Sequence, residues 1–322
     1  MTSQQGVALV VGASRGMGRQ VAIDLAKAGY KGKYPTILQL DQETVVVSAK
    51  STSDASKVHP FPPDPNSSLS TINTVAREIH EAGGEAVAIV ADTRDPDAAK
   101  NMVDKAVAVF GRLDVLVYNS GAIWWASVEN TPFKRYKLMQ QVNVEGLYST
   151  VQAALPHFKN QGWKGRIVVV SPPIYSRFFR GKTAYAMGKV AMSVLTKGLA
   201  MDFEREGKKE MAISSMWVAT GIQSAATTST GTEDMKDLRK PTIFSDAVLA
   251  LLRSPATQVN GLIDVDEDFL RKTGVTDFAK YSLVPGTSPR RIMPANFPDL
   301  TVAEQDDEGK RMDSVQMRTS KL

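Results

Sequence analysis

A short apolar run at residues 6–11 leads directly into a glycine-rich turn and then into a helical pattern that continues to Ala28. An apolar run of this length is typical of a buried parallel strand. The turn carries Gly12, Gly16 and Gly18 in the spacing G-x-x-x-G-x-G. A strand, a glycine turn and a helix in this order present free backbone N–H groups to a phosphate. The competing interpretation is a plain tight turn before a helix. The placement favours a nucleotide-binding segment.

Apolar runs and helical patterns go on alternating as far as residue 265. Strands that alternate with helices predict an α/β fold of the Rossmann type, with a right-handed, doubly wound parallel sheet and ligands at the carboxyl ends of its strands. We expect one domain over residues 1–275 and a C-terminal extension over residues 276–322. Further strands are expected at residues 86–91, 113–118, 167–170, 212–217 and 262–265, and helices at 69–82, from 95, at 133–158, around 185 and at 245–252.

The region between residues 30 and 50 offers two candidates for the second strand of the sheet, residues 36–40 and 44–49. An acid at the end of this strand binds a ribose 2′-hydroxyl, whereas a basic residue binds a 2′-phosphate. Asp41 supports the first case, and Lys50 with Ser51 supports the second. The candidate at 44–49 is more apolar and more β-branched, as a central strand should be. We therefore expect Lys50, assisted by Arg15, to favour NADP(H) over NAD(H).

Tyr185 and Lys189 are four residues apart in a helical pattern, so both side chains leave the same face. A phenol has an ordinary pKa of about 10, and a neighbouring ammonium group favours the phenolate. That pair suits proton transfer to or from an alcohol oxygen. Taken alone the pattern is weak, because Tyr and Lys at this spacing often decorate a surface helix.

Composition excludes several classes of protein. The chain has no cysteine, which excludes disulfides, thiolate metal sites and a cysteine nucleophile, and its three histidines lie in no metal-ligand spacing. No apolar run is long enough to span a bilayer, and the first residues do not look like a secretory signal. The net charge is +5, but no basic block with interleaved aromatics predicts nucleic-acid binding.

Several motifs occur together in a fixed order: the glycine turn, Asp92, Asn119-Ser120-Gly121, Asn143 and the Tyr185/Lys189 pair. In this combination, residues 6–265 resemble the classical short-chain dehydrogenase/reductase family. More narrowly, the Ser-Pro-Pro at 171–173, Trp217 and residues 264–285 resemble a group of hydroxysteroid dehydrogenase-like proteins. Members of that group carry a sterol-carrier domain after the reductase domain, for which this chain is too short.

The resemblance implies a role for each motif. Tyr185 would be the general acid/base, Lys189 would lower its pKa and hold the nicotinamide ribose, Asn143 would anchor a relay water, and Asn119 would stabilise the sheet beside the cofactor. Ser171 would be the serine that contacts the substrate carbonyl. The implied cofactor contacts are Gly12, Ser14, Arg15, Gly16, Met17 and Gly18 at the phosphates, Lys50 and Ser51 at the ribose, Asp92 and Thr93 at the adenine, then Asn119, Ser120, Gly121, Tyr185 and Lys189, and finally Thr220 and Ile222 at the carboxamide.

Three departures from the family pattern concern the site. The usual Thr before Gly12 is Val11, and the usual Pro-Gly after the sixth strand is Val218-Ala219. The usual serine position, counted without gaps, is Pro172, and Ser171 falls one residue early. Either the proline-stiffened loop turns Ser171 into the site, or another group such as Tyr175 or Ser176 serves, or the serine role is absent.

These features support an oxidoreductase that interconverts a ketone and a secondary alcohol on a lipid-like or polyketide-like substrate. The alternative is an NADP-binding protein of the same fold with a non-redox role, as an isomerase or cyclase, or with a scaffold role. Aromatic residues on segments expected near the site mouth suggest an apolar ligand, although at least half of them are expected to be ordinary core or dimer contacts. These aromatics are Trp124, Trp125, Tyr175, Phe178, Phe179 and Trp217.

Two further expectations concern partners and cellular location. The helices that begin near Phe133 and Thr183 carry broad apolar faces, which this family usually pairs in a homodimer or homotetramer. Periodicity is lost from Ser288 onward, as in an extension with a flexible end. The sequence ends in Ser320-Lys321-Leu322, which as a free C-terminus is an address read by the peroxisomal import receptor. We expect a peroxisomal protein, and otherwise a cytoplasmic one.

Overall fold

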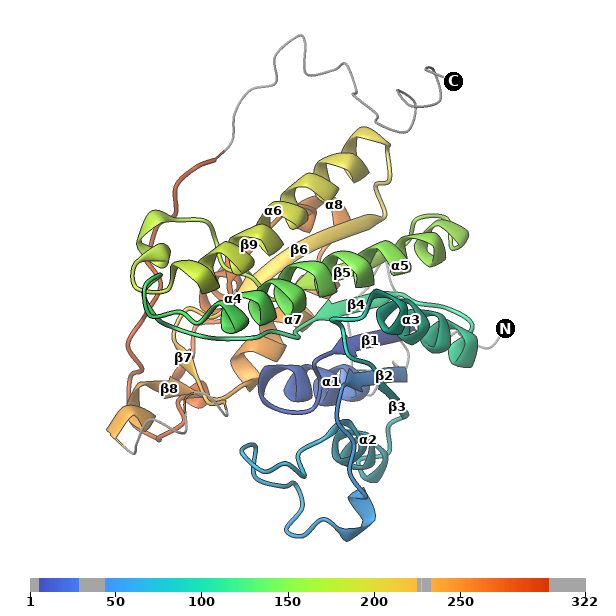
Figure 1. Cartoon of the computed structure of the whole chain (residues 1–322), viewed down its shortest axis with the longest axis horizontal. Coiled ribbons are helices and arrows are strands. Elements are labelled where there is room, and N and C mark those ends of the chain that lie inside the picture. The colour runs from blue at the N-terminus through green and yellow to red at the C-terminus, as the bar shows by residue number, and fades with distance from the viewer. Residues whose placement is uncertain (1–5, 29–43, 225–226, 228–232, 301–322) are drawn as a thin grey trace.

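The computed structural model of the chain describes residues 6–28, 44–224, 227 and 233–300. Within them, seven strands form one parallel sheet in the order β3-β2-β1-β4-β5-β6-β9 (Figure 1). This order confirms the expected Rossmann-type fold. The strands are β1 (Val7–Val11), β2 (Thr44–Ala49), β3 (Ala86–Val90), β4 (Val115–Tyr118), β5 (Gly165–Val169), β6 (Met211–Trp217) and β9 (Ile263–Val265), and β7 (Gly221–Ile222) pairs separately with β8 (Leu238–Arg239).

Helices cover both faces of the sheet and enclose two buried apolar clusters. Helices α1, α2, α7 and α9 bury their apolar residues on one face, and α3, α5 and α6 on the other. None of the helices within the described ranges is long and apolar enough to cross a membrane. The helices are α1 (Gly16–Ala28), α2 (Ile72–Glu81), α3 (Pro96–Phe110), α4 (Phe133–Met139), α5 (Gly146–Asn160), α6 (Thr183–Arg205), α7 (Thr242–Arg253), α8 (Ala256–Val259) and α9 (Asp266–Lys272).

Strand register brings the ends of three strands to one edge. Val11, the last residue of β1, is paired with Ser48 of β2 on one side and with Tyr118 of β4 on the other. The chain leaving each strand therefore emerges at the same carboxyl edge, where an open parallel sheet binds its ligand. The glycine turn, Lys50 and Asn119 all follow these three strands within two residues.

The helix expected over residues 133–158 is interrupted. Between α4 and α5 the chain makes a π-helical turn over Gln140–Glu145. Single π-turns inside helices are rare and are common at functional sites. The turn is centred on Asn143, which the sequence had placed in an unbroken helix.

The structure resolves the choice between the two strand candidates as far as its described residues reach. Residues 44–49 form β2, between β1 and β3, as expected for the more β-branched candidate. The candidate at 36–40 and Asp41 lie outside the described residues. Helix α9 was not predicted. It is only two turns long, so its sequence carries little periodic signal.

Residues 276–300 pack against the domain. Phe278 and Tyr281 join the apolar cluster on the α1 side, and Met293 joins a small cluster with Ala219 and Val265. We call residues 290–297 the C-terminal strap (red in Figure 1). The strap is the part of the expected extension that reaches the carboxyl edge of the sheet.

Candidate active site

The glycine turn and the end of β4 interlock. Gly12 adopts a left-handed φ of +86°, and a Cβ placed there would come within 2.6 Å of the Ser120 nitrogen. The Asn119 side chain donates from Nδ2 to the Gly12 carbonyl at 2.9 Å, and a Cβ on Gly18 would overlap both groups. Any side chain at either glycine would therefore push the turn off the sheet.

The side-chain carbonyl of Asn119 lacks a hydrogen-bond donor among the described residues. Its Oδ1 atom is buried. A buried acceptor without a donor costs about 1–3 kcal/mol, so a group that binds here and donates to it is favoured. Gly16, the first residue of α1, faces Ser224 across the turn, and a Cβ added to Gly16 would lie 4.0 Å from the Ser224 Cβ. The exposed N-terminus of α1 between them suits a phosphate.

The adenine end of the predicted site lies beyond β2 and β3. Lys50 and Ser51 are both exposed directly after β2. Asp92 follows β3, and both of its carboxylate oxygens lie 2.9 Å from the Arg94 Nε, which shares its one N–H between them. Pairing with Arg94 lowers the pKa of the Asp92 carboxyl. Thr93 is buried beside it.

Arg15 is already engaged in the structure. Its guanidinium donates to the carbonyl of Pro65 at 3.2 Å and to that of Ser70 at 3.5 Å, both in the loop between β2 and α2. This loop therefore determines where the Arg15 charge lies. Ser14 and Met17 are half-buried in the same turn.

Tyr185 and Lys189 lie one turn apart on α6, and each is only 3% exposed. The Lys189 ammonium donates to the Val170 carbonyl at 2.8 Å. Burial lowers the pKa of Lys189 to about 7 and raises the pKa of Tyr185 above its usual value. In the ligand-free protein, then, desolvation outweighs the expected effect of the ammonium on the phenol, and the neutral phenol is the stable form.

Asn143 and Lys189 converge on the end of β4. The Asn143 amide is fully buried and pairs with the backbone of Ala122, accepting from its N–H at 2.8 Å and donating to its carbonyl at 3.1 Å. A Cβ on Gly121 would lie 3.5 Å from the Lys189 Nζ and 3.6 Å from the Asn143 Oδ1. Both distances are ordinary van der Waals contacts, so the backbone of Gly121 lies directly beside the two polar groups.

Ser171 takes a different place from the other predicted catalytic residues. Its hydroxyl is fully buried, 2.6 Å from the Ser215 hydroxyl, and accepts from the Ser193 hydroxyl at 3.0 Å. Thr196 extends this hydroxyl cluster at 2.9 Å from Ser215. The geometry favours a structural role for Ser171 between β5, β6 and α6, and the substrate-contacting role stays a prediction.

Aromatic rings surround Tyr185. The centroids of Phe178 and Trp125 lie 6.2 Å and 6.3 Å from that of Tyr185, and Trp217 meets Phe178 edge-on at 6.3 Å. Tyr175 packs beside Phe178 at 5.8 Å and against Phe297 of the strap at 5.8 Å. We refer to Trp124, Trp125, Tyr175, Phe178 and Trp217 as the aromatic wall.

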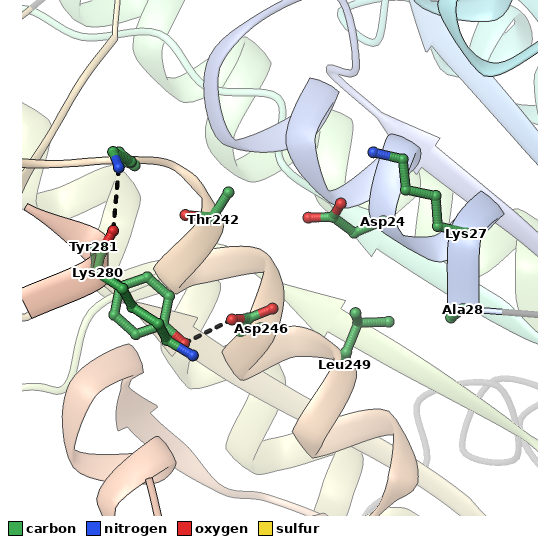
Figure 2. A pocket seen from close by; sticks show the side chains of 9 residues that line it. Asp24, Lys27, Ala28, Thr242, Asp246, Leu249, Lys280 and Tyr281 are labelled. Carbon is green, nitrogen blue, oxygen red and sulfur yellow. Dashed lines mark hydrogen bonds between the residues drawn. The ribbon is translucent and has the colours of Figure 1, made fainter. Parts of the chain in front are cut away.

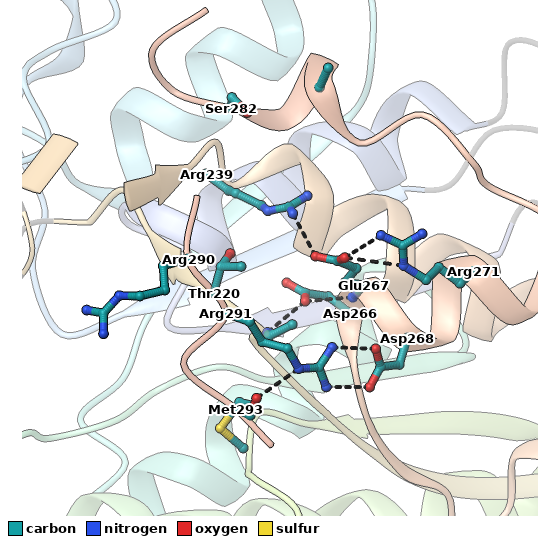
Figure 3. A network of polar contacts seen from close by, with 12 residues as sticks. Thr220, Arg239, Asp266, Glu267, Asp268, Arg271, Ser282, Arg290, Arg291 and Met293 are labelled. Atoms are coloured by element: carbon teal, nitrogen blue, oxygen red, sulfur yellow. Dashed lines mark hydrogen bonds and ion pairs between the residues drawn. The ribbon is translucent and has the colours of Figure 1, made fainter. Parts of the chain in front are cut away.

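The loop after β6, where Thr220 and Ile222 were expected to meet the nicotinamide, is held from two sides (Figure 3). The Ala219 N–H donates to Asp266 Oδ1 at 2.8 Å, and the Ala219 carbonyl accepts from the backbone of Ile292 at 2.9 Å and of Met293 at 3.2 Å. Thr220 and Ile222 themselves are buried. Neither α9 nor the strap was assigned this role from sequence.

A network of ion pairs fixes the strap to α9 (Figure 3). Arg291 makes a bidentate pair with Asp268, with both N–O distances at 2.6 Å, and donates to the carbonyls of Met293 and Pro294 at 2.8 Å. Glu267 pairs with Arg239 at 2.7 Å and with Arg271 at 2.6 Å. The acidic first turn of α9, visible in the sequence, was the signal that could have marked this anchor.

Asp266 is the most deeply buried member of this network. It is fully inaccessible, accepts at Oδ1 from the N–H groups of Ala219 and Glu267, and has no partner for Oδ2 among the described residues. Burial raises the pKa of the Asp266 carboxyl to about 7. A carboxyl kept in so costly a place indicates that holding Ala219 matters to the fold of this loop.

A pocket lies away from the predicted site residues, between the end of α1 and α7 (Figure 2). It has a volume of about 480 Å³ and is lined among others by Asp24, Lys27, Asp246 and Tyr281. None of the predicted site residues lines it. Over the described stretches, no three His, Cys, Asp or Glu side chains are grouped so that they could hold a metal ion.

Comparison with known families decides the class of this site. The model of the short chain dehydrogenase family matches residues 66–234, which is more than half of the chain. The chain belongs to the short-chain dehydrogenase family. This family consists of oxidoreductases that act on CH–OH and C=O groups and bind NAD(P)(H). The unpaired Asn119 acceptor, the bare glycine turn and the N-terminus of α1 fit that cofactor.

Individual relatives and a solved structure are similar to this chain over most of its length. Hydroxysteroid dehydrogenase-like protein 2 of Mus musculus is 32% identical over 92% of this chain and 56% of its own length, and that of Danio rerio is 34% identical over 86% and 60%. The chain thus spans little more than half the length of these curated relatives. A short chain dehydrogenase structure from Mycobacterium thermoresistibile is 33% identical, with a TM-score of 0.74, over 90% of this chain and 95% of its own.

Proposed function

We propose that this short-chain dehydrogenase interconverts a ketone and a secondary alcohol on an apolar substrate, with NADP(H) as cofactor and Tyr185 as general acid/base. The observation that carries the proposal is the convergence of Lys189 and Asn143 beside Gly121, at the sheet edge where the glycine turn lies, with Tyr185 one turn of α6 before Lys189. The aromatic wall supports an apolar substrate, because the rings of Trp125 and Phe178 pack directly against the Tyr185 ring.

The protein's own groups account for the proton. In the reducing direction, NADPH held at the glycine turn and the end of β4 would supply the hydride chemistry. The Tyr185 hydroxyl would give its proton to the carbonyl oxygen. The phenolate that remains is stabilised by Lys189, whose pKa of about 7 leaves it protonated in a large fraction of molecules at neutral pH. A proton from solvent then restores the phenol, so one NADPH and one proton are consumed for each alcohol formed.

A second function is favoured by one observation. Pro172 stands where the family has its serine, and the Ser171 hydroxyl is buried in a structural cluster. A protein that binds NADP(H) without redox turnover, as an isomerase, cyclase or scaffold, needs no such serine. Stoichiometric consumption of NADPH with a panel of ketones separates the two: loss of NADPH matched by alcohol supports the oxidoreductase, and tight NADPH binding without any turnover supports the alternative.

Preference for NADP(H) is assigned to Lys50. Because this exposed lysine directly follows β2, Lys50→Ala is expected to weaken NADPH binding about tenfold, the loss of one charge-assisted hydrogen bond to a phosphate. NADH binding should change less than about twofold. Lys57→Ala, an exposed lysine of the same loop that pairs with Asp54, is the matched control in titrations followed by cofactor fluorescence. Equal loss of both cofactors in Lys50→Ala would count against the assignment.

A homodimer or homotetramer is also proposed, and exposed apolar residues support it. Met187, Val194 and Met201 stand seven residues apart on α6, each more than half exposed, and Phe133 and Tyr148 are exposed on α4 and α5. Isolated surface apolar residues are ordinary, but a stripe along one helix is typical of an interface.

Val194→Glu should therefore dissociate the oligomer, since a buried unpaired charge costs several kcal/mol. Light scattering coupled to size exclusion measures the mass. Val109→Glu, an equally exposed valine on α3, should leave the mass unchanged. A wild type that is monomeric at micromolar concentration contradicts the proposal.

Residues 320–322 lie outside the described residues, and we propose that they are read by the peroxisomal import receptor. Deleting Ser320-Lys321-Leu322 should abolish binding to the receptor's peptide-binding domain and shift an N-terminally tagged protein from peroxisomes to the cytosol. A chain with one glycine added after Leu322 should behave like the deletion, because the address requires a free Leu carboxylate. Unchanged peroxisomal location of both variants would refute this address.

A further inference from the structure

Lys182 stands beside the proposed reaction centre. Its Nζ lies 4.6 Å from the centroid of the Phe178 ring and 5.9 Å from that of Trp125. Both rings contact Tyr185. The Lys182 ammonium therefore lies against the aromatic wall, one ring away from the Tyr185 phenol.

Lys182 has no anionic partner among the described residues. No carboxylate of the described residues lies within ion-pair distance of Lys182, and the segment from Ser171 to Lys189 contains no Asp or Glu at all. Burial lowers the pKa of the Lys182 ammonium, and no neighbouring carboxylate opposes that effect. In the part of the chain that the structure describes, the ring faces alone stabilise the charge, by about 0.5–2 kcal/mol.

The surroundings of Lys182 are also cationic. Arg177 and Arg180, on the same segment, are exposed, and the Arg135 guanidinium lies 4.6 Å over the Trp124 ring. Glu129 is the one acid in the segment from 119 to 137 that carries Trp124 and Trp125. The field at this mouth therefore favours an incoming anion over a neutral molecule or a cation.

We propose that the substrate is an amphipathic carboxylate whose anionic group binds Lys182 while its apolar body lies against the aromatic wall. The proposal rests on the proposed oxidoreductase function and adds the chemical class of the substrate. A carboxylate replaces the water lost by the ammonium with a charge-assisted hydrogen bond, which is about twice as strong as a neutral one. The ring faces beside Lys182 hold the adjoining alkyl or polycyclic portion, and the oxidisable carbon lies at Tyr185.

The alternative is that Lys182 is a solvated surface charge at the start of α6. In that case Lys182 would contribute equally little to the binding of acids and to the binding of neutral molecules of the same shape. Decanoate and decan-1-ol have the same carbon chain and differ in the group at one end. Their binding to the NADP⁺-saturated protein, measured by calorimetry and by quenching of tryptophan fluorescence, separates the two interpretations without requiring turnover.

The wild type should bind decanoate more tightly than decan-1-ol. Lys182→Met should weaken decanoate binding about tenfold, the loss of one hydrogen bond to a charged group, and leave decan-1-ol within about twofold. Lys182→Arg should retain the preference for the acid. Lys197→Met, which removes an exposed lysine from the same helix, is the control and should change neither affinity.

Each outcome of these measurements either supports or overturns the proposal. A wild type without preference for the carboxylate, including one that binds neither ligand, overturns the proposal, as does equal weakening of both ligands in Lys182→Met. Failure of the oxidoreductase proposal looks different, because it leaves decanoate binding dependent on Lys182 while no ketone consumes NADPH. The melting temperature of Lys182→Met, with its side chain half-exposed, serves as the check that the variant is folded.

Discussion

Tyr185→Phe is expected to lower kcat by about a thousandfold while NADP(H) affinity stays within about twofold, because a positioned acid/base contributes about 10²–10⁴ to the rate. The phenol is 3% exposed and packed between Phe178 and Trp125, so removing one oxygen leaves its ring in place. The measurement is NADPH oxidation with a ketone that the wild type reduces, beside a titration of cofactor fluorescence.

Tyr148→Phe is the matched control, since this tyrosine is more than half exposed on α5 and away from the aromatic wall. It should retain wild-type turnover. If Tyr185→Phe kept most of the wild-type kcat, the acid/base assignment would be wrong. If it lost NADP(H) binding instead, the phenol would be needed for cofactor binding rather than for proton transfer.

The second large effect is expected at Asp266. Asp266→Ala should weaken NADP(H) binding about tenfold or more, because two buried N–H groups, of Ala219 and Glu267, lose their acceptor at about 1–3 kcal/mol each. Ala219 leads into Thr220 and Ile222, the residues predicted at the nicotinamide. Binding of 2′,5′-ADP, which has the adenine and phosphate portions but no nicotinamide, should change less than about twofold.

Two further variants make this test specific. Asp266→Asn keeps the Oδ1 acceptor and should retain most of the affinity for NADP(H). Arg291→Met removes the bidentate pair with Asp268 and should weaken NADP(H) selectively too, by loosening the strap that donates to the Ala219 carbonyl. Equal weakening of NADP(H) and 2′,5′-ADP by both Asp266→Ala and Arg291→Met would mean that the network merely stabilises the fold.

Local signals predicted the sheet well, and they predicted that the residues expected at the nucleotide lie at one edge of it. The strand at 44–49 could be chosen over the one at 36–40 because a central strand must be apolar on both faces. Gly12, Asn119 and Lys50 could be assigned to one edge because parallel strands end together. These inferences use only neighbours along the chain and the fixed geometry of a parallel sheet.

Contacts between distant segments could not be predicted. Ser171 turned toward Ser193 and Ser215 because three hydroxyls satisfy one another under α6, which no local pattern encodes. The π-turn at Asn143 and the hold of Asp266 on Ala219 depend in the same way on tertiary partners. The burial that raises the pKa of Tyr185 in the ligand-free protein depends on the same tertiary packing, whereas the favourable effect of a nearby lysine on the phenolate stays a prediction.

The C-terminal strap has a consequence for the synthesis of the chain. Proteins leave the ribosome from the N-terminus, and domains often begin to fold during that process. The glycine turn and the first strands emerge early, but the Ala219 carbonyl receives its hydrogen bonds from Ile292 and Met293, which emerge after every strand of the sheet. A ligand stabilises only the folded form that can bind it. NAD(P)(H) should therefore add its full stabilisation to a nascent chain only after the strap has left the exit tunnel, so cofactor supply can govern folding only from that point of synthesis onward.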